Sequence, residues 1–424
     1  MNYLKMSKND IESEKSSLLK EYEAYKAKGL SLNMARGKPS PEQLDLSLPL
    51  FDSLKSTDSY LSADGIDCRN YGEFDGIPEC KHFFADLLEI DPDNVFVGGN
   101  SSLNMMFDTI SCFMTAQIYD DTLPWHDVKD RKFLCPVPGY DRHFGITGYF
   151  GFEMIPIPMD ENGPDMDMVE ELVSKDPSIK GIWCVPKYSN PTGITYSDEV
   201  VKRFAALKPA AKDFRIMWDN AYAIHDVTDT PDKLLNIMDE CKKNGNEDLP
   251  IIFCSTSKIT FSGAGVAALA TSSYNIKVLK KRLQYATIGY DKLNMLRHMR
   301  FFKNFEGLLN HMEKHKAILA PKFKTVIEKL NTQLGDTEIA EWTNPNGGYF
   351  VSVNVYKGTA KRVVELCKEA GVVLTGAGAT YPYGIDPDDK NIRIAPSFPS
   401  VDELAQAMDV FCVCVKLAAL EKLA

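Results

Sequence analysis

The stretch Ile251-Ile252-Phe253-Cys254-Ser255-Thr256-Ser257-Lys258 is the most informative part of the sequence. Its first four residues are apolar, which predicts a buried strand. The strand leads into hydroxyl residues, the lysine Lys258 and the glycine-rich segment Gly263-Ala264-Gly265. A lysine confined at the end of a sheet can lose its proton through desolvation, and a neutral amine attacks carbonyl carbons. A surface lysine beside an ordinary turn would explain the same stretch, so the rest of the chain must decide.

Four further stretches follow the same plan of a short apolar strand that ends in polar residues. Strands are expected at 95–97, 131–136, 182–186 and 215–218. They lead into segments that contain Asn100-Ser101-Ser102, Tyr140-Asp141-Arg142-His143, Ser189-Asn190-Pro191-Thr192-Gly193 and Asp219-Asn220-Ala221-Tyr222. Helical segments separate these strands, which predicts an α/β fold with a mostly parallel sheet and helices on both faces. Ligands of such sheets bind beyond the carboxyl ends of the strands, so we expect these polar groups to converge with Lys258.

The sequence also predicts how the chain divides into three parts. Residues 1–55 are expected to form an N-terminal helix, with Asn9 or Asp10 as its N-cap, and an arm that packs with a small domain. Residues 56–310 would form the large domain. Residues 311–424 would form a smaller α+β domain, because a long helical stretch is followed there by alternating strands and helices.

The composition excludes several classes of partner. The net charge of −11 argues against a nucleic-acid binder or a protein of anionic membranes. Ten scattered cysteines without a Cys-x-x-Cys pair indicate reduced thiols, with neither a disulfide framework nor a zinc or other metal site. The N-terminus lacks the apolar core of a signal peptide, and no apolar run reaches transmembrane length. A cytoplasmic protein is therefore expected.

The polar segments would suit a cofactor that carries an aldehyde and a pyridine ring. Lys258 could form an imine with the aldehyde, and Asp219 could keep the ring nitrogen protonated. Asn190 and Tyr222 are uncharged donors for the phenolic oxygen of the ring, and Tyr140 could lie flat against it. The phosphate could be surrounded by a helix N-terminus and by hydroxyl and amide groups, namely Asn100, Ser101, Ser102, Ser255 and Ser257. Each residue also has an ordinary alternative as a helix cap, turn residue or solvated loop residue.

Arg393 lies in the middle of an apolar strand, between Ile392 and Ile394. An unpaired guanidinium there would be costly, so a carboxylate partner is expected. The partner could be the substrate or an acidic residue of the same domain.

Three motifs carry a resemblance to a known family: Asn190-Pro191-Thr192-Gly193, Asp219-x-x-Tyr222 and Ser255-x-Ser257-Lys258. Over about residues 30–400 the chain resembles fold-type I pyridoxal-phosphate enzymes of the class I aminotransferase superfamily. Within it, the chain is most similar to divergent bacterial aspartate aminotransferases that look like the aminotransferase part of MocR regulators.

The resemblance implies a set of roles. Lys258 would hold the pyridoxal 5'-phosphate and move the proton, Asp219 would pair with the ring nitrogen with His143 behind it, and Tyr140 would stack on the ring. Arg393 would bind the substrate α-carboxylate. Asn190 and Gly37 would line the substrate pocket, and Tyr71 would reach the phosphate of the neighbouring subunit in a homodimer. One position departs from the family: Val266 stands where an arginine usually binds the phosphate, so hydroxyls and a helix N-terminus, or another cation, must replace it.

The implied activity is exchange of an amino group between an L-amino acid, expected to be aspartate, and a 2-oxo acid, expected to be 2-oxoglutarate. A carbon–sulfur β-lyase would use the same residues. A ligand-sensing regulatory domain would need a basic helix-turn-helix at the N-terminus, where the sequence predicts one helix of mixed charge. The candidates for a second substrate carboxylate are Arg36, Lys38, Arg297 and Arg300.

Overall fold

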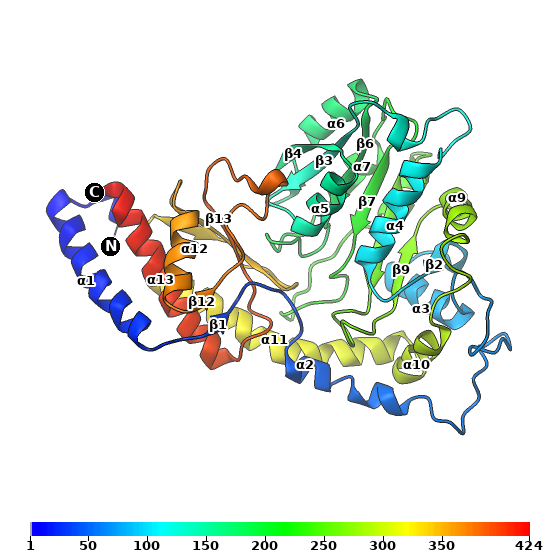
Figure 1. The fold of residues 1–424 in the computed structure, drawn as a ribbon, viewed down its shortest axis with the longest axis horizontal. Coiled ribbons are helices and arrows are strands. Elements are labelled where there is room, and N and C mark those ends of the chain that lie inside the picture. Colours follow the sequence, from blue (N-terminus) through cyan, green and yellow to red (C-terminus); the bar gives the residue numbers. More distant parts are fainter. Residues whose placement is uncertain (1) are drawn as a thin grey trace.

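An eight-stranded sheet forms the centre of the larger part of the computed structural model, which describes residues 2–424 (Figure 1). The strand order is β2 (Val95–Val97), β9 (Ala267–Ala270), β8 (Pro250–Ser255), β7 (Arg215–Asp219), β6 (Ile179–Cys184), β3 (Lys132–Val137), β4 (Glu153–Asp160) and β5 (Gly163–Pro164). The strands from β8 to β4 pair in parallel, while β9 runs antiparallel to both of its neighbours and β5 runs antiparallel to β4. The predicted mostly parallel sheet is therefore confirmed.

Helices cover both faces of this sheet because its strands direct buried apolar side chains to both sides. One face packs against α4 (Ser102–Thr115), α5 (Asp141–Tyr149) and α9 (Ser273–Leu283). The other face packs against α3 (Pro78–Leu88), α6 (Met166–Lys175), α7 (Asp198–Ala205), α8 (Ile237–Lys243) and α10 (Lys292–Phe302). The carboxyl ends of the parallel strands stay free of these helices and can take part in a site.

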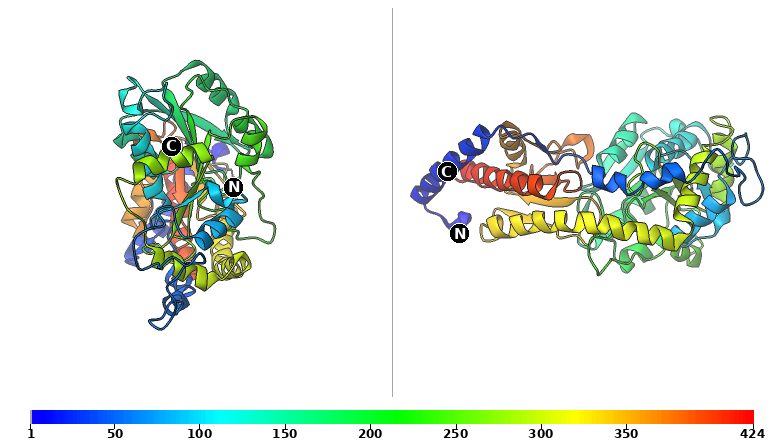
Figure 2. Two further views of the ribbon diagram at one scale, coloured as in Figure 1. Left: turned by 90° about the vertical axis from the view of Figure 1, so that its right-hand side faces the viewer. Right: turned by 90° about the horizontal axis from the view of Figure 1, so that it is seen from below.

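The smaller part has its own core. Strands β10 (Ala340–Trp342), β11 (Val351–Val355) and β13 (Asn391–Ile394) form an antiparallel sheet, covered by α12 (Ala360–Glu369) and α13 (Val401–Leu423). The helix α11 (Phe305–Leu334) lies beside α13 and extends from there to the large part (Figure 2). Within residues 2–424, no helix has the length and apolar character needed to cross a membrane.

The N-terminal segment belongs structurally to the smaller part. Helix α1 (Lys8–Ala27) packs on α13 through Ile11, Leu18 and Tyr22, and β1 (Leu32–Asn33) pairs in parallel with β12 (Val372–Val373). The expected N-cap was wrong: Ser7 caps α1, and Asp10 is its capping-box partner.

After β1, the chain passes through α2 (Pro41–Asp45) to the large part. Helix α11 crosses residues 310 and 311 without a break. The domain division into 1–55, 56–310 and 311–424 therefore stays a prediction.

Candidate active site

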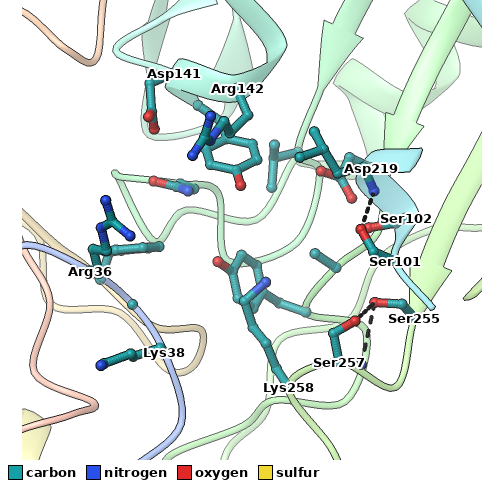
Figure 3. A pocket seen from close by; sticks show the side chains of 18 of the residues that line it. Arg36, Lys38, Ser101, Ser102, Asp141, Arg142, Asp219, Ser255, Ser257 and Lys258 are labelled. Atoms are coloured by element: carbon teal, nitrogen blue, oxygen red, sulfur yellow. Dashed lines mark hydrogen bonds between the residues drawn. The ribbon is translucent and has the colours of Figure 1, made fainter. Parts of the chain in front are cut away.

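A cavity of about 550 Å³ lies at the carboxyl ends of the parallel strands, where the large part meets the smaller one (Figure 3). It brings together most of the residues expected from the sequence. These are Gly37, Ser101, Ser102, Tyr140, Asn190, Asp219, Tyr222, Ser255, Ser257, Lys258 and Arg393. Asn100 and Tyr71 are not among its lining residues. The predicted convergence of polar groups at this edge of the sheet is therefore observed.

Lys258 follows β8 and directs its amine into the cavity. Its Nζ lies 4.8 Å from the centre of the Tyr222 ring. Burial lowers the pKa of the Lys258 amine, and the nearby Asp219 carboxylate only partly opposes that effect. Burial also raises the pKa of the Tyr222 phenol well above its usual value, which keeps it a neutral donor. A lysine of lowered pKa is a nucleophile at lower pH than an exposed one.

Asp219 is the last residue of β7, and only one of its two carboxylate oxygens has a hydrogen-bond partner among residues 2–424. Its Oδ2 lies 3.0 Å from His143 Nε2, and the His143 ring stacks on Trp183 with 4.3 Å between the ring centres. Its Oδ1 is buried and has no hydrogen-bond partner within residues 2–424. Buried polar atoms are nearly always hydrogen-bonded, so this acceptor suits an N–H donor of a bound molecule. A protonated pyridine nitrogen is such a donor.

The serines form a hydroxyl-rich end of the cavity beside the N-terminus of α4. Ser101 is the N-cap of this helix, and its Oγ accepts from the N–H of Leu103 at 3.2 Å. Ser255 Oγ donates to Ser257 Oγ at 3.1 Å, and Ser257 Oγ donates to the backbone oxygen of Asn100 at 2.9 Å. Hydroxyls next to free helix N–H groups can bind a phosphate. Asn100 thus contributes a carbonyl that positions Ser257, and its own side chain is exposed.

Val266 has an uncharged, apolar side chain and cannot bind a phosphate as an arginine at this position would. Its side chain is 2% exposed and lies in the core of the large part. Its N–H donates to Thr256 Oγ1 at 2.9 Å, and its carbonyl accepts from the N–H of Thr256 at 2.8 Å. Figure 3 shows Arg36, Lys38 and Arg142 on the side of the cavity away from the four serines. The hydroxyl end of the cavity therefore offers serine hydroxyls and the N–H groups at the start of α4.

Arg393 extends from β13 into the cavity and contacts the large part. Its Nη1 donates to Asp141 Oδ1 at 3.0 Å and to Asn190 Oδ1 at 3.1 Å, and its Nη2 donates to Thr375 Oγ1 at 3.3 Å. Its Nε is buried and has no partner within residues 2–424. The guanidinium lies 4.8 Å from the centre of the Phe350 ring. Arg393 thus has an acidic partner, but from the large part and not from its own domain, and it still has an unused donor.

The cavity is narrow at Gly37, where a Cβ would collide with the Phe350 ring. Arg36 and Lys38 line the cavity. Arg297 and Arg300 do not: Arg297 Nη2 donates to Asn294 Oδ1 at 2.9 Å, and Arg300 Nη1 lies 3.7 Å from Asp58 Oδ2. These two arginines therefore do not line the cavity of their own chain.

Asp141 and Arg142 also line the cavity, although no role was expected for either of them from the sequence. Their position directly after Tyr140, in a polar segment at the end of a strand, was the signal that could have identified them.

Residues 6–424 match the family model described as aspartate amino-transferase. The chain belongs to this family. An aspartate aminotransferase of Corynebacterium glutamicum is 48% identical over 421 residues, with 98% of this chain and 97% of that protein covered. A protein of Mycolicibacterium smegmatis that is named as an aminotransferase is also 48% identical, with 100% and 99% covered.

Solved structures agree with this membership. The crystal structure of an aspartate transaminase from Corynebacterium glutamicum superimposes with a TM-score of 0.97 at 47% identity, covering 100% of both chains. LysN, an α-aminoadipate aminotransferase from Thermus thermophilus, has a TM-score of 0.74 at 19% identity and covers 93% of this chain and 94% of its own. That distant likeness concerns the fold alone. The protein is an aminotransferase of the aspartate aminotransferase type, with the fold of fold-type I enzymes.

Proposed function

We propose that this aminotransferase uses pyridoxal 5'-phosphate to move the amino group of L-aspartate to 2-oxoglutarate. The observation that carries the proposal is the pairing of two groups in one cavity: the buried amine of Lys258 and the unpartnered Oδ1 of Asp219. An amine of lowered pKa suits the aldehyde, and a buried carboxylate oxygen suits the ring nitrogen. The substrate choice is supported by the printed name of the 48% identical relative.

The bound cofactor would supply a pyridine ring that accepts the electrons released at the substrate α-carbon. Asp219 Oδ1 would accept the hydrogen bond of the ring nitrogen, and His143 would keep the Asp219 carboxylate in place through the 3.0 Å contact at Oδ2. The phenol of Tyr140 lines the same cavity and would cover one face of the ring. Ser101, Ser102, Ser255 and Ser257 would hold the phosphate.

Lys258 Nζ would take up the proton from the substrate α-carbon and return it to the cofactor carbon that carried the aldehyde. Burial lowers the pKa of the Lys258 amine, which favours the unprotonated form that can accept this proton. Tyr222 and the amide nitrogen of Asn190 would donate to the phenolic oxygen of the ring. Asn190 Oδ1 already accepts from Arg393, which leaves the amide N–H groups available for this second contact.

Arg393 would bind the α-carboxylate of the amino acid. Its Nε is the unused donor of a planar fork, and Nη1 and Nη2 already point to acceptors within the cavity wall. Carboxylates bind such forks through two parallel hydrogen bonds. Gly37, which leaves no space for a side chain next to Phe350, would shape the same pocket.

A homodimer with shared sites is part of the proposal. Tyr71, Tyr285 and Ile288 are 77%, 88% and 64% exposed. Gly72 follows Tyr71, and its carbonyl accepts from Nζ of Lys292 at 2.8 Å, which brings this segment close to the start of α10. Exposed large apolar side chains of this kind fit a protein interface. Tyr71 would reach the phosphate site of the partner from there, and sedimentation of the Tyr71→Ala variant would test this arrangement.

A cytoplasmic location is also proposed, because ten free, buried thiols suit a reducing compartment.

The proposal is tested with purified holoenzyme, L-aspartate and 2-oxoglutarate. Oxaloacetate and glutamate should form in equal amounts. A carbon–sulfur β-lyase would instead release pyruvate from cystathionine without an acceptor, and no feature of the cavity favours that reaction. Pyruvate release without amino transfer would overturn the proposal. The regulatory alternative finds no support in α1, which packs on α13 as a part of the small-domain core.

A further inference from the structure

The main chain of Lys258 is held from outside the cavity by a buried hydroxyl of the smaller part. Tyr349 lies just before β11, is fully buried, and is not among the residues that line the cavity. Its hydroxyl donates to the carbonyl oxygen of Lys258 at 3.3 Å. Burial raises the pKa of the Tyr349 phenol, which keeps it a neutral donor. This hydrogen bond joins the smaller part to the large part directly behind the proposed nucleophile.

The side chain of Gln43, in α2, fixes the direction of this hydrogen bond. Its Oε1 accepts from the N–H of Ser40 at 3.1 Å, so the two hydrogens of the amide are on the other atom, Nε2. This Nε2 lies 3.0 Å from the hydroxyl oxygen of Tyr349 and 3.1 Å from His315 Nδ1. Because the Tyr349 oxygen accepts from Gln43, its own proton is left for the carbonyl of Lys258.

Two histidines of α11 extend this network to the next peptide. His315 Nε2 lies 3.1 Å from His311 Nε2, which in turn lies 2.9 Å from the carbonyl oxygen of Ile259. Burial lowers the pKa of His311 and lowers that of His315 to about 4, so both rings are neutral near neutral pH. The turn that follows β8 is therefore held at two consecutive carbonyls, those of Lys258 and Ile259, by uncharged groups.

The ring of Tyr349 also supports a second group beside the Lys258 amine. It packs against Tyr222 with 5.9 Å between the ring centres, and edge to face against His225 with 5.8 Å. The Tyr222 ring is the one that lies 4.8 Å from Lys258 Nζ. Burial lowers the pKa of His225 well below its usual value, so this ring is neutral too. Tyr349 thus contacts both the main chain of Lys258 and the phenol that would donate to the cofactor ring.

We propose that Tyr349, oriented by Gln43, is a positioning residue that fixes the main chain of Lys258 and the ring of Tyr222 and thereby aims Nζ at the cofactor and the substrate. The proposal rests on the proposed function and deepens it, because it names residues outside the cavity that hold the reacting amine. An amine that forms a bond and then moves a proton needs a fixed approach, and a displacement of about 1 Å can cost about 100-fold in rate.

The test compares holoenzyme of the wild type with Tyr349→Phe, Gln43→Met and the double variant. Tyr22→Phe is the matched control, because Tyr22 is also a buried phenol of the small-domain core that donates to a backbone carbonyl, that of Leu366 at 3.0 Å. Asp219, whose charge acts on the Lys258 amine, is unchanged in every variant. The measurements are the pH titration of the cofactor absorbance, kcat and KM with L-aspartate, and Tm.

The midpoint of the pH titration reports the proton on the nitrogen that joins Lys258 to the cofactor. Tyr349→Phe should raise this midpoint by about 0.5 unit or more, because a less firmly held Tyr222 donates more weakly to the ring oxygen and that oxygen then holds the proton better. The same variant should lower kcat about 10-fold with little change in KM. Tyr22→Phe should lower Tm without changing the midpoint or kcat.

Gln43→Met should shift the midpoint in the same direction. The double variant should shift it no further than Tyr349→Phe does, because Gln43 acts through Tyr349. A midpoint and kcat of wild-type size in Tyr349→Phe, an equal shift in Tyr22→Phe, or additive shifts in the double variant would each overturn the proposal. If Tyr349→Phe does not fold, the midpoint of Gln43→Met decides alone. A wild type that binds no pyridoxal phosphate would overturn the proposed function as well, whereas the other outcomes overturn this inference only.

Discussion

Arg393 Nη1 lies 3.0 Å from Asp141 Oδ1, which joins the last strand of the small domain to the first residue of α5 in the large part. The Arg393 side chain is 7% exposed and the Asp141 side chain 38%. From the sequence, either the substrate or an acid of the same domain was expected as the partner of Arg393. In the structure, an acid of the other part occupies the arginine, so a substrate carboxylate must share or displace it.

We expect Arg393→Lys to lower kcat/KM for every amino donor by a similar factor. Every donor carries the α-carboxylate, and the lost bidentate contact should cost about 2–4 kcal/mol in transition-state binding. Donor kinetics with aspartate and alanine, together with Tm and the cofactor spectrum, provide the measurement. A large loss of Tm with nearly normal kinetics would show that Arg393 is structural.

Asp141→Asn should bind carboxylate ligands more tightly than the wild type. Removing the charge of Asp141 frees the Arg393 guanidinium, and a partly exposed ion pair of this kind is worth roughly 1 kcal/mol. Titration calorimetry with propionate should show a Kd about fivefold lower. Weaker binding would instead indicate that Asp141 holds Arg393 in the productive orientation.

Asp219→Ala should keep the fold and lose most of the activity. Without the carboxylate the ring nitrogen of the cofactor lacks its partner, and the loss in kcat should reach several orders of magnitude. Circular dichroism and steady-state kinetics test this expectation. A variant that turns over at a near-normal rate would mean that another group serves the ring nitrogen.

We expect protonation of His298 to lower the free energy of unfolding in acid. Its Nε2 lies 2.9 Å from Thr260 Oγ1, and burial lowers its pKa to about 4. The unfolded chain has a histidine pKa of about 6.5 and binds the proton first, so stability falls as the pH decreases from about 6.5 to about 4. This single group should contribute roughly 3 kcal/mol over that window.

Urea unfolding of His298→Gln at several pH values measures this contribution. The difference in unfolding free energy between wild type and variant should shrink as the pH decreases through that window. Parallel curves for the two proteins would contradict the assignment.

The strands that lead to the site could be predicted because each is a short apolar run that ends in polar residues. Three strands of the eight-stranded sheet were missed, namely β4, β5 and β9, of which β5 has only two residues. In β4, Pro156 and Pro158 interrupt the apolar pattern, and prolines argue against a sheet strand. In β9, three of the four residues are alanine, which has a low preference for strands.

The parts of the site that lie in short sequence motifs could be predicted. The parts that depend on contacts between distant residues could not. Lys258, Asp219 and the serines follow from strand-end motifs. The pairing of Arg393 with Asp141 joins residues 252 positions apart, and no local pattern indicates such a contact.

The most direct test of the whole account is to identify the residue that holds the cofactor. Holoenzyme is reduced with borohydride, digested, and analysed by mass spectrometry for a peptide that carries the pyridoxyl phosphate group. The account predicts one modified residue, Lys258, at one group per chain. A modification on any other lysine, or the absence of a covalently fixed cofactor in the active enzyme, would contradict it.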